Sequence, residues 1–248
     1  MEKFAESIYR EMGEVAVLVF HGLTTTPLAM EDTINYLTAN GYTVYAPLLP
    51  GHGTTPEDLN NTKYTEWVET ALKSYHELKD RGFEKIFVLG HSMGGVLALR
   101  LGELHADMKG LIISAAPMVL KGLLIKLTGL LKRFVKFKKK KGPPEQYFKG
   151  GRRISYDVWP IKSVHELLKL IDITKKELRS IISPIMLIYG VEDEMVDISS
   201  LDVIYENVSS KVKRRLVLEG IGHNTLTGPK MKFVHSEIVN FIKEMSVD

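Results

Sequence analysis

The stretch that decides the fold reads Lys-Ile-Phe-Val-Leu at residues 85–89, Gly-His-Ser-Met-Gly at 90–94 and Gly-Val-Leu-Ala-Leu-Arg-Leu at 95–101. The first part is an apolar run typical of a buried strand, and the last part is typical of a buried helix. A strand, a sharp Gly-x-Ser-x-Gly turn and a helix lift the serine hydroxyl clear of the sheet. Gly90 and Gly94 suit this turn because side chains there would collide as strand and helix close on each other. We therefore predict that Ser92 is a nucleophile.

Outside this stretch, short apolar runs alternate with helical patterns, which favours a mostly parallel sheet covered on both faces. Most runs are rich in Val, Ile and Leu without polar alternation, as expected of strands buried on both faces. The predicted fold class is therefore α/β, with about six to seven strands and helices on both faces. The expected strands are 14–20, 43–48, 85–89, 110–114, 184–189 and 214–218, and the expected helices are 27–40, 64–80, the segment after Ser92, 198–207 and 230–245.

The regular alternation breaks after Ser114, and the next strand is expected only at Pro184. A structureless loop of that length is rare in a compact domain, so the segment should be an inserted cap. We predict that residues 118–180 form this cap and that residues 1–117 and 181–248 form the core. Within the cap we expect a helix over 118–137, a break at Gly142-Pro143-Pro144 and a second helix over 163–171.

A serine hydroxyl needs a base to take its proton, and the chain has eight histidines from which to choose. His223 lies in Gly-Ile-Gly-His-Asn at 220–224, after the last expected strand. Catalytic groups of open α/β sheets gather at the carboxyl ends of the strands, so His223 is the predicted base. His91 is expected to point away from the serine, and the histidines expected on helices or at their ends are His76, His105, His165 and His235.

The residue that orients this base is expected in the loop after the preceding strand, Gly-Val-Glu-Asp-Glu-Met-Val-Asp at 190–197. Four carboxylates compete there. We predict Asp193, because it stands three residues past the glycine that ends the strand and because a short Asp holds imidazole in one tautomer more rigidly than a Glu. The other three, Glu192, Glu194 and Asp197, are expected to be solvated loop charges.

An acyl-transfer intermediate needs two backbone N–H donors aimed at its oxyanion. One is expected from Met93, the residue after the nucleophile. The other is expected from Leu23, in the loop that follows the first strand at His21-Gly22. Gly22 lets the backbone turn toward the site, and His21 is expected to brace the loop by hydrogen bonding. His52, in Gly-His-Gly at 51–53, is interpreted as another bracing residue and not as a second base.

Composition narrows the classes of function. The 248 residues include no cysteine, which excludes disulfides, zinc–thiolate sites and cysteine nucleophiles and fits a cytoplasmic location. We expect no signal peptide and no membrane span. The net charge of +3 conceals a basic segment, because residues 118–153 hold twelve Lys or Arg and one acidic residue. We expect Lys138–Lys141 to lie in water, with weak contact to an anionic membrane surface as the alternative. Nucleic-acid binding is not expected, since no aromatic stacking pattern accompanies the lysines.

Taken together, these motifs resemble those of bacterial carboxylesterases and monoacylglycerol lipase-like α/β hydrolases. The likeness covers residues 13–117 and 181–246, including Val17–Gly22, Pro50–Gly53, Gly90–Gly95, Gly190–Asp193 and Gly222-His223. It implies an α/β-hydrolase fold with an inserted helical cap, a catalytic triad of Ser92, Asp193 and His223, and an oxyanion hole at Leu23 and Met93. The basic charge of residues 118–153 is a departure from the family pattern.

The function expected is that of a carboxylesterase acting on short- to medium-chain esters, with an apolar acyl group and without cofactor or metal. Monoacylglycerol lipase, thioesterase and carbon–carbon bond hydrolase are alternatives that use the same triad. A catalytically dead hydrolase fold acting as a binding module is the alternative from another class. Dehalogenase and epoxide-hydrolase chemistry is disfavoured, because relatives with those activities carry Asp where Ser92 stands.

Overall fold

A seven-stranded sheet forms the centre of the protein in the computed structural model, which describes residues 5–122, 129 and 132–247. The strand order is β1-β3-β2-β4-β5-β10-β11, and all neighbours are parallel except β1 and β3. The strands are β1 Ile8–Arg10, β2 Val15–Phe20, β3 Thr43–Ala46, β4 Lys85–His91, β5 Gly110–Ser114, β10 Ile185–Gly190 and β11 Lys213–Leu218. All six predicted strands are present. The seventh, β1, has three residues, too few for a pattern to reveal it.

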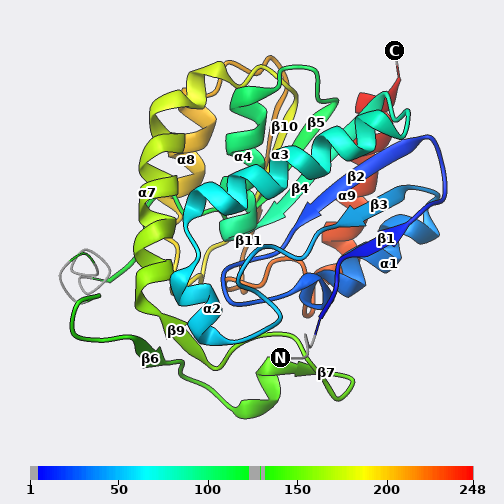
Figure 1. Ribbon diagram of the computed structural model, residues 1–248. Coiled ribbons are helices and arrows are strands. Elements are labelled where there is room, and N and C mark those ends of the chain that lie inside the picture. The colour runs from blue at the N-terminus through cyan, green and yellow to red at the C-terminus, as the bar shows by residue number, and fades with distance from the viewer. Residues whose placement is uncertain (1–4, 123–128, 130–131, 248) are drawn as a thin grey trace.

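Helices cover both faces of this sheet (Figure 1). Alternate residues of β2 point to opposite faces, so Leu18 and Phe20 join one apolar cluster while Val17 and Val19 join the other. The first cluster includes residues of α3 Tyr64–Asp80, α4 Met93–Leu104 and α8 Ser199–Asn207, and the second includes residues of α1 Glu31–Ala39 and α9 Met231–Ser246. Two short helices, η1 Pro27–Met30 and α2 Pro56–Asn61, complete the core. Burial on both faces explains why the strands lack polar alternation.

The register of the sheet brings the segments after β2, β4, β5, β10 and β11 to one edge. Phe20 at the end of β2 pairs with Gly90, and His91 at the end of β4 pairs with Ser114. On the far side, Gly190 at the end of β10 pairs with Leu218 at the end of β11. Because these strands are parallel, the segments after them leave the sheet at the same edge, where open α/β sheets place their sites.

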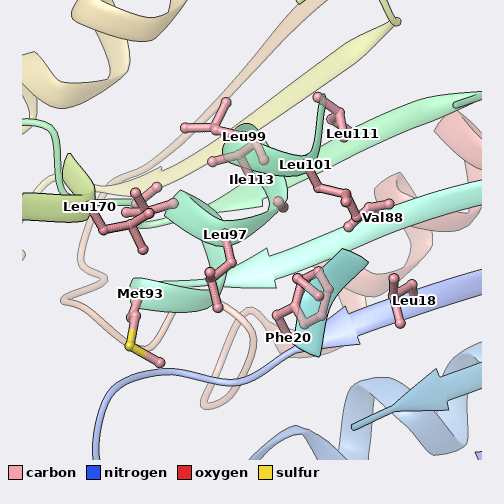
Figure 2. Close-up of a cluster of buried hydrophobic side chains, with 14 of the residues drawn as sticks. Leu18, Phe20, Val88, Met93, Leu97, Leu99, Leu101, Leu111, Ile113 and Leu170 are labelled. Atoms are coloured by element: carbon pink, nitrogen blue, oxygen red, sulfur yellow. The ribbon is translucent and has the colours of Figure 1, made fainter. Parts of the chain in front are cut away.

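In its described residues, the long segment between β5 and β10 contains two strand pairs that were not predicted. Its strands pair as β6 Phe137–Lys139 with β9 Val158–Pro160, and β7 Phe148–Lys149 with β8 Arg152–Arg153, with η2 Pro144–Tyr147 between them. The helix expected over 163–171 is present as the longer α7 Ile161–Glu177, followed by η3 Leu178–Ser180. Leu170 of α7 packs beside Leu97 of α4 in the core cluster (Figure 2).

The helix predicted over 118–137 is wrong at both ends. Residues 123–128 and 130–131 lie outside the described part of the chain. On the near side, Leu120 forms a bridge with Val196 and Gly122 has a φ of 102°, which no right-handed helix continues. On the far side, the chain runs through turns into β6. At these two ends, pairing of Leu120 and of Phe137–Lys139 with distant segments overrides the helical pattern.

Part of the basic charge of this segment is neutralised by the core. Lys149 Nζ lies 2.6 Å from Asp32 Oδ1, and Arg152 donates to Glu31 at 2.7 Å, so the β7–β8 hairpin contacts the first turn of α1. Each pair is partly exposed, and such pairs contribute little stability singly. Their effect is to orient the hairpin against the core, which the charge count alone did not predict.

Candidate active site

The loop between β4 and α4 forms a sharp elbow at Ser92. Ser92 has φ 55° and ψ −121°, a region that non-glycine residues rarely adopt and that costs about 1–3 kcal/mol. A Cβ at Gly90 would overlap the carbonyl of Gly94, and one at Gly94 would overlap the carbonyl of Phe20. Only glycine therefore allows β2, β4 and α4 to approach this closely. The Ser92 N–H donates to Ser114 O at 2.8 Å, which ties the strained residue to the neighbouring strand.

Asp193 and His223 meet across the loops that follow β10 and β11. His223 Nδ1 lies 2.6 Å from Asp193 Oδ2. The other oxygen, Oδ1, accepts from the backbone N–H groups of Met195 and Val196 at 2.8 and 2.9 Å. Burial alone would raise the pKa of Asp193, but the hydrogen bond and charge of His223 and the two backbone donors lower it below its usual value. Asp193 is therefore an anion whose three hydrogen bonds fix its direction.

The competing carboxylates of the same loop are placed differently. Glu192 and Glu194 are exposed, whereas Asp193 is only 2% exposed. Asp197 accepts from the backbone of Ser199 at 3.0 Å at the start of α8. The loop is held by Glu192 N–H, which donates to Ile221 O, and by Gly190, where a Cβ would overlap that same carbonyl. The four carboxylates thus have distinct environments, and Asp193 alone of the four touches His223 in the described part of the chain.

His223 lies beside the serine elbow. Its ring centroid is 5.0 Å from that of His91, the residue before Ser92. His91 itself contacts Ser114 Oγ at 2.8 Å, and burial, with the charge of His223, lowers the pKa of His91 to about 3. His91 is therefore a neutral side chain turned toward β5. Within the described residues no hydrogen bond joins Ser92 Oγ to His223, and such catalytic contacts commonly tighten only when substrate binds.

The loop after β2 passes directly over the elbow. A Cβ built on Gly22 would lie 3.4 Å from Ser92 Cβ, an ordinary van der Waals contact, so the loop backbone passes close to the serine. Leu23 and Met93 are both buried, and the backbone N–H of neither donates to another described residue. Two backbone donors near Ser92 are what an oxyanion hole requires, and the role of Leu23 and Met93 in one stays a prediction.

His21 and His52 brace this loop, as their positions in the sequence suggested. Leu49 N–H donates to His21 Nε2 at 3.2 Å, so the ring proton is on Nδ1, which donates to Gly22 O at 3.1 Å. Burial lowers the pKa of His21 to about 4, which keeps it neutral. His52 packs edge-on against His21, with centroids 4.9 Å apart, and its Nδ1 contacts Pro50 O. Neither ring is placed to act as a base.

Two lysines of the basic segment reach the site, which sequence reasoning missed. Lys121 Nζ donates to the backbone carbonyl of Asp193 at 2.8 Å. Lys140 Nζ donates to Thr24 Oγ1 at 2.5 Å and to Ser155 Oγ at 2.9 Å. The expectation that Lys138–Lys141 all lie in water is therefore wrong for Lys140. No local pattern distinguishes it from its neighbours, because its partner Thr24 lies far away in the chain.

No metal centre is evident in the described ranges. Within residues 5–122, 129 and 132–247, no group of three or more His, Asp or Glu side chains is arranged to hold a metal ion. In the same part of the chain, no helix is long and apolar enough to cross a membrane.

The parallel sheet, the serine elbow and an Asp–His pair at the same edge together define an α/β hydrolase. Comparison with known proteins agrees. The family described as serine aminopeptidase, S33, matches residues 14–150, and the chain belongs to this family of α/β hydrolases, in its carboxylesterase and monoacylglycerol lipase-like branch.

Two curated relatives match over most of their length. A carboxylesterase of Bacillus subtilis strain 168 is 30% identical over 234 residues, which cover 94% of each chain. A thermostable monoacylglycerol lipase of Bacillus sp. strain H-257 is 34% identical over 223 residues, which cover 88% of this chain and 86% of the relative.

Solved structures share the fold. A structure from work on the metagenome-derived lipolytic enzymes LipS and LipT superposes with a TM-score of 0.88 at 24% identity, covering 97% of this chain and 98% of that one. The monoacylglycerol lipase of Paleococcus ferrophilus superposes with a TM-score of 0.82 at 21% identity, covering 99% of this chain and 100% of the other. The predicted fold class is confirmed.

Proposed function

We propose that this protein is a carboxylesterase that hydrolyses short- to medium-chain esters through Ser92, His223 and Asp193. The observation that carries the proposal is the 2.6 Å contact between His223 Nδ1 and the buried Asp193 carboxylate, next to the strained Ser92 elbow. A nucleophile on a strained turn, a base beside it and an acid behind the base are the parts that acyl transfer requires.

In the proposed reaction, Ser92 Oγ attacks the ester carbonyl while His223 Nε2 takes the hydroxyl proton. The carbonyl oxygen becomes an oxyanion, which accepts from the backbone N–H groups of Leu23 and Met93. The intermediate collapses, His223 returns the proton to the departing alcohol, and an acyl-enzyme remains. Water then attacks the acyl-enzyme with His223 again as base, which releases the carboxylic acid and regenerates Ser92. Asp193 stabilises the imidazolium formed in each half of the cycle.

Ester chemistry is favoured over peptide chemistry by the relatives. The family description names an aminopeptidase, but the two curated relatives matched over most of their length are named as a carboxylesterase and a monoacylglycerol lipase. Monoacylglycerol hydrolysis is therefore the second candidate, supported by the relative at 34% identity. We also propose that residues 118–180 act as the cap over the acyl group, since segments 154–156 and 120–121 of this insertion contact the loops around Ser92 and Asp193.

The test is Ser92→Ala, assayed with p-nitrophenyl esters of increasing acyl length and with monoacylglycerols alongside. Ser236→Ala is the matched control, because Ser236 lies on α9 and donates only within its own helix. We expect the Ser92 variant to keep its fold and lose several orders of magnitude in rate, whereas the control keeps full activity. A wild-type protein that hydrolyses none of these esters would instead support a binding module. Full activity in the Ser92 variant would reject the nucleophile.

A further inference from the structure

The inserted segment is joined to the loop that carries Leu23. Thr25 and Ser155 form an antiparallel bridge, and Tyr156 N–H donates to Thr24 O at 2.9 Å. One residue further, Thr26 Oγ1 contacts Ile154 O at 3.5 Å. An isolated β-bridge and two neighbouring hydrogen bonds therefore connect the loop that carries Leu23 to the insertion.

Lys140 lies at the centre of this junction. Its Nζ donates to Thr24 Oγ1 at 2.5 Å and to Ser155 Oγ at 2.9 Å, so it joins the two segments through their side chains. The ammonium also lies 4.4 Å from the ring centroid of Trp159, in cation–π contact. The backbone N–H of Lys140 donates to Asp157 O, which fixes the position from which the side chain extends.

The charged groups around Lys140 are few. Burial lowers its pKa to about 7, with Asp157 opposing this shift and Arg153 adding to it. His52, on the core side, is buried and neutral, because burial, together with its neighbours His21 and Lys140, holds its pKa well below the usual value. Burial of a lysine ammonium costs free energy unless hydrogen bonds compensate for it. The contacts with Thr24 and Ser155 supply such hydrogen bonds and hold the Lys140 side chain between the two segments.

Thr24 has a strained backbone conformation. Its φ is 70°, in the left-handed region that a β-branched side chain rarely occupies. It follows Leu23 directly, so a displacement of Thr24 also displaces the Leu23 backbone. A side-chain hydrogen bond at 2.5 Å to Thr24 is therefore placed to hold the strained conformation.

We propose that Lys140 is a positioning residue of the oxyanion loop, which holds Thr24 in its left-handed conformation and so aims the Leu23 N–H at the oxyanion. This inference rests on the proposed function, because it takes Leu23 as a donor of the oxyanion hole. It assigns the basic insertion a part in transition-state stabilisation, separate from covering the acyl group. The contribution appears in kcat, since the donor acts on charge that develops only as the reaction proceeds.

The first experiment compares Lys140→Met with Lys139→Met, its exposed neighbour in β6, using a soluble p-nitrophenyl ester. We expect Lys140→Met to lower kcat by about 10- to 100-fold with KM within about threefold, because misplacement of a catalytic donor by about 1 Å has effects of that size. The control should stay within about twofold on both parameters. A raised KM with unchanged kcat would show that Lys140 contacts substrate instead, and unchanged kcat and KM would show no role in turnover. Either result overturns the proposal.

The second experiment tests the route through Thr24. Thr24→Val removes the hydroxyl but keeps the shape, so it should reproduce the kcat loss, whereas Thr24→Ser keeps the hydroxyl and should retain most activity. In the double variant Lys140→Met/Thr24→Val, the loss should equal that of either single variant, since both break one link. Losses that multiply would overturn the proposal. If Lys140→Met does not fold, the contrast between Val and Ser at position 24 still decides it.

The positioning role of Lys140 and the esterase mechanism can be refuted separately. If Ser92→Ala is inactive while Lys140→Met and Thr24→Val turn over like wild type, the positioning role is wrong and the esterase assignment stands. If Ser92→Ala keeps full activity, the esterase mechanism itself is wrong. The rate at which a p-nitrophenyl phosphonate labels Ser92 is an independent readout, because its transition state also places charge on the oxyanion donors. It should fall in parallel with kcat in both Lys140→Met and Thr24→Val, and an unchanged labelling rate would overturn the positioning role.

Discussion

Replacement of Asp193 by Asn tests the site most sharply, because the structure defines what the amide must do. Oδ1 accepts from two backbone N–H groups, so the amide oxygen of Asn must take that position and its NH₂ must face His223. Two N–H groups cannot face each other across 2.6 Å, so Nδ1 of His223 must lose its proton to Nε2. A ring that is protonated on Nε2 cannot accept the proton of Ser92.

We therefore expect Asp193→Asn to lower kcat for a p-nitrophenyl ester by up to ~10⁴-fold, the effect of a wrong imidazole tautomer. The free energy of unfolding should fall by only about 1 kcal/mol, because both backbone donors keep their acceptor and only the hydrogen bond to His223 changes from charged to neutral. Initial rates over several substrate concentrations measure the first quantity. Urea denaturation followed by circular dichroism measures the second.

Three carboxylates of the same loop serve as controls, changed one at a time to the amide: Glu192→Gln, Glu194→Gln and Asp197→Asn. Each should keep kcat within about twofold, because none of these three described residues contacts His223 and charges at or near the surface contribute little. The reasoning is refuted if Asp193→Asn retains more than about a tenth of wild-type kcat while folded. It is also refuted if Glu192→Gln or Asp197→Asn proves the sensitive change.

Three further outcomes follow from the structure. Gly94→Ala should destabilise the fold by about 1–3 kcal/mol or more in thermal denaturation, since its Cβ overlaps the Phe20 carbonyl, whereas Gly222→Ala meets only an ordinary 3.5 Å contact. Burial raises the pKa of Glu103 to about 7 despite its 2.7 Å pair with Arg100, so the folded state binds an extra proton between pH 4.5 and 7 and loses stability as pH rises. The free energy of unfolding of Glu103→Gln, relative to that of wild type, should therefore rise by at most roughly 3 kcal/mol from pH 5 to pH 8. A difference that does not change with pH would contradict this. Changing three exposed lysines, Lys138, Lys139 and Lys141, to Gln should leave turnover of a soluble ester within about twofold. Salt-sensitive adsorption of the wild-type protein to anionic vesicles would instead favour a membrane role for this surface, which lies near the exposed Phe134 in the chain.

Much of the core could be predicted from the sequence, because its signals are local. The Val-, Ile- and Leu-rich runs predict the six main strands, since strands buried on both faces need apolar residues at every position. Gly90 and Gly94 around Ser92 predict an elbow, since no other residue fits where a Cβ would overlap a neighbouring carbonyl. Their positions after the last two expected strands selected Asp193 and His223, which the structure pairs, while their catalytic roles stay predictions for the variants above.

The tertiary structure alone decided the arrangement of the insertion. The apolar, lysine-rich stretch that begins at Met118 has a helical pattern, but Leu120 pairs with Val196 and Phe137–Lys139 pairs with β9. Lys140 looks like its exposed neighbours in sequence, yet it contacts Thr24, 116 positions away, and Arg152 contacts Glu31, 121 positions away. Such contacts depend on the fold placing distant segments side by side. The energy of a charge depends on the groups that surround it in the folded chain, and neither composition nor periodicity identifies those groups.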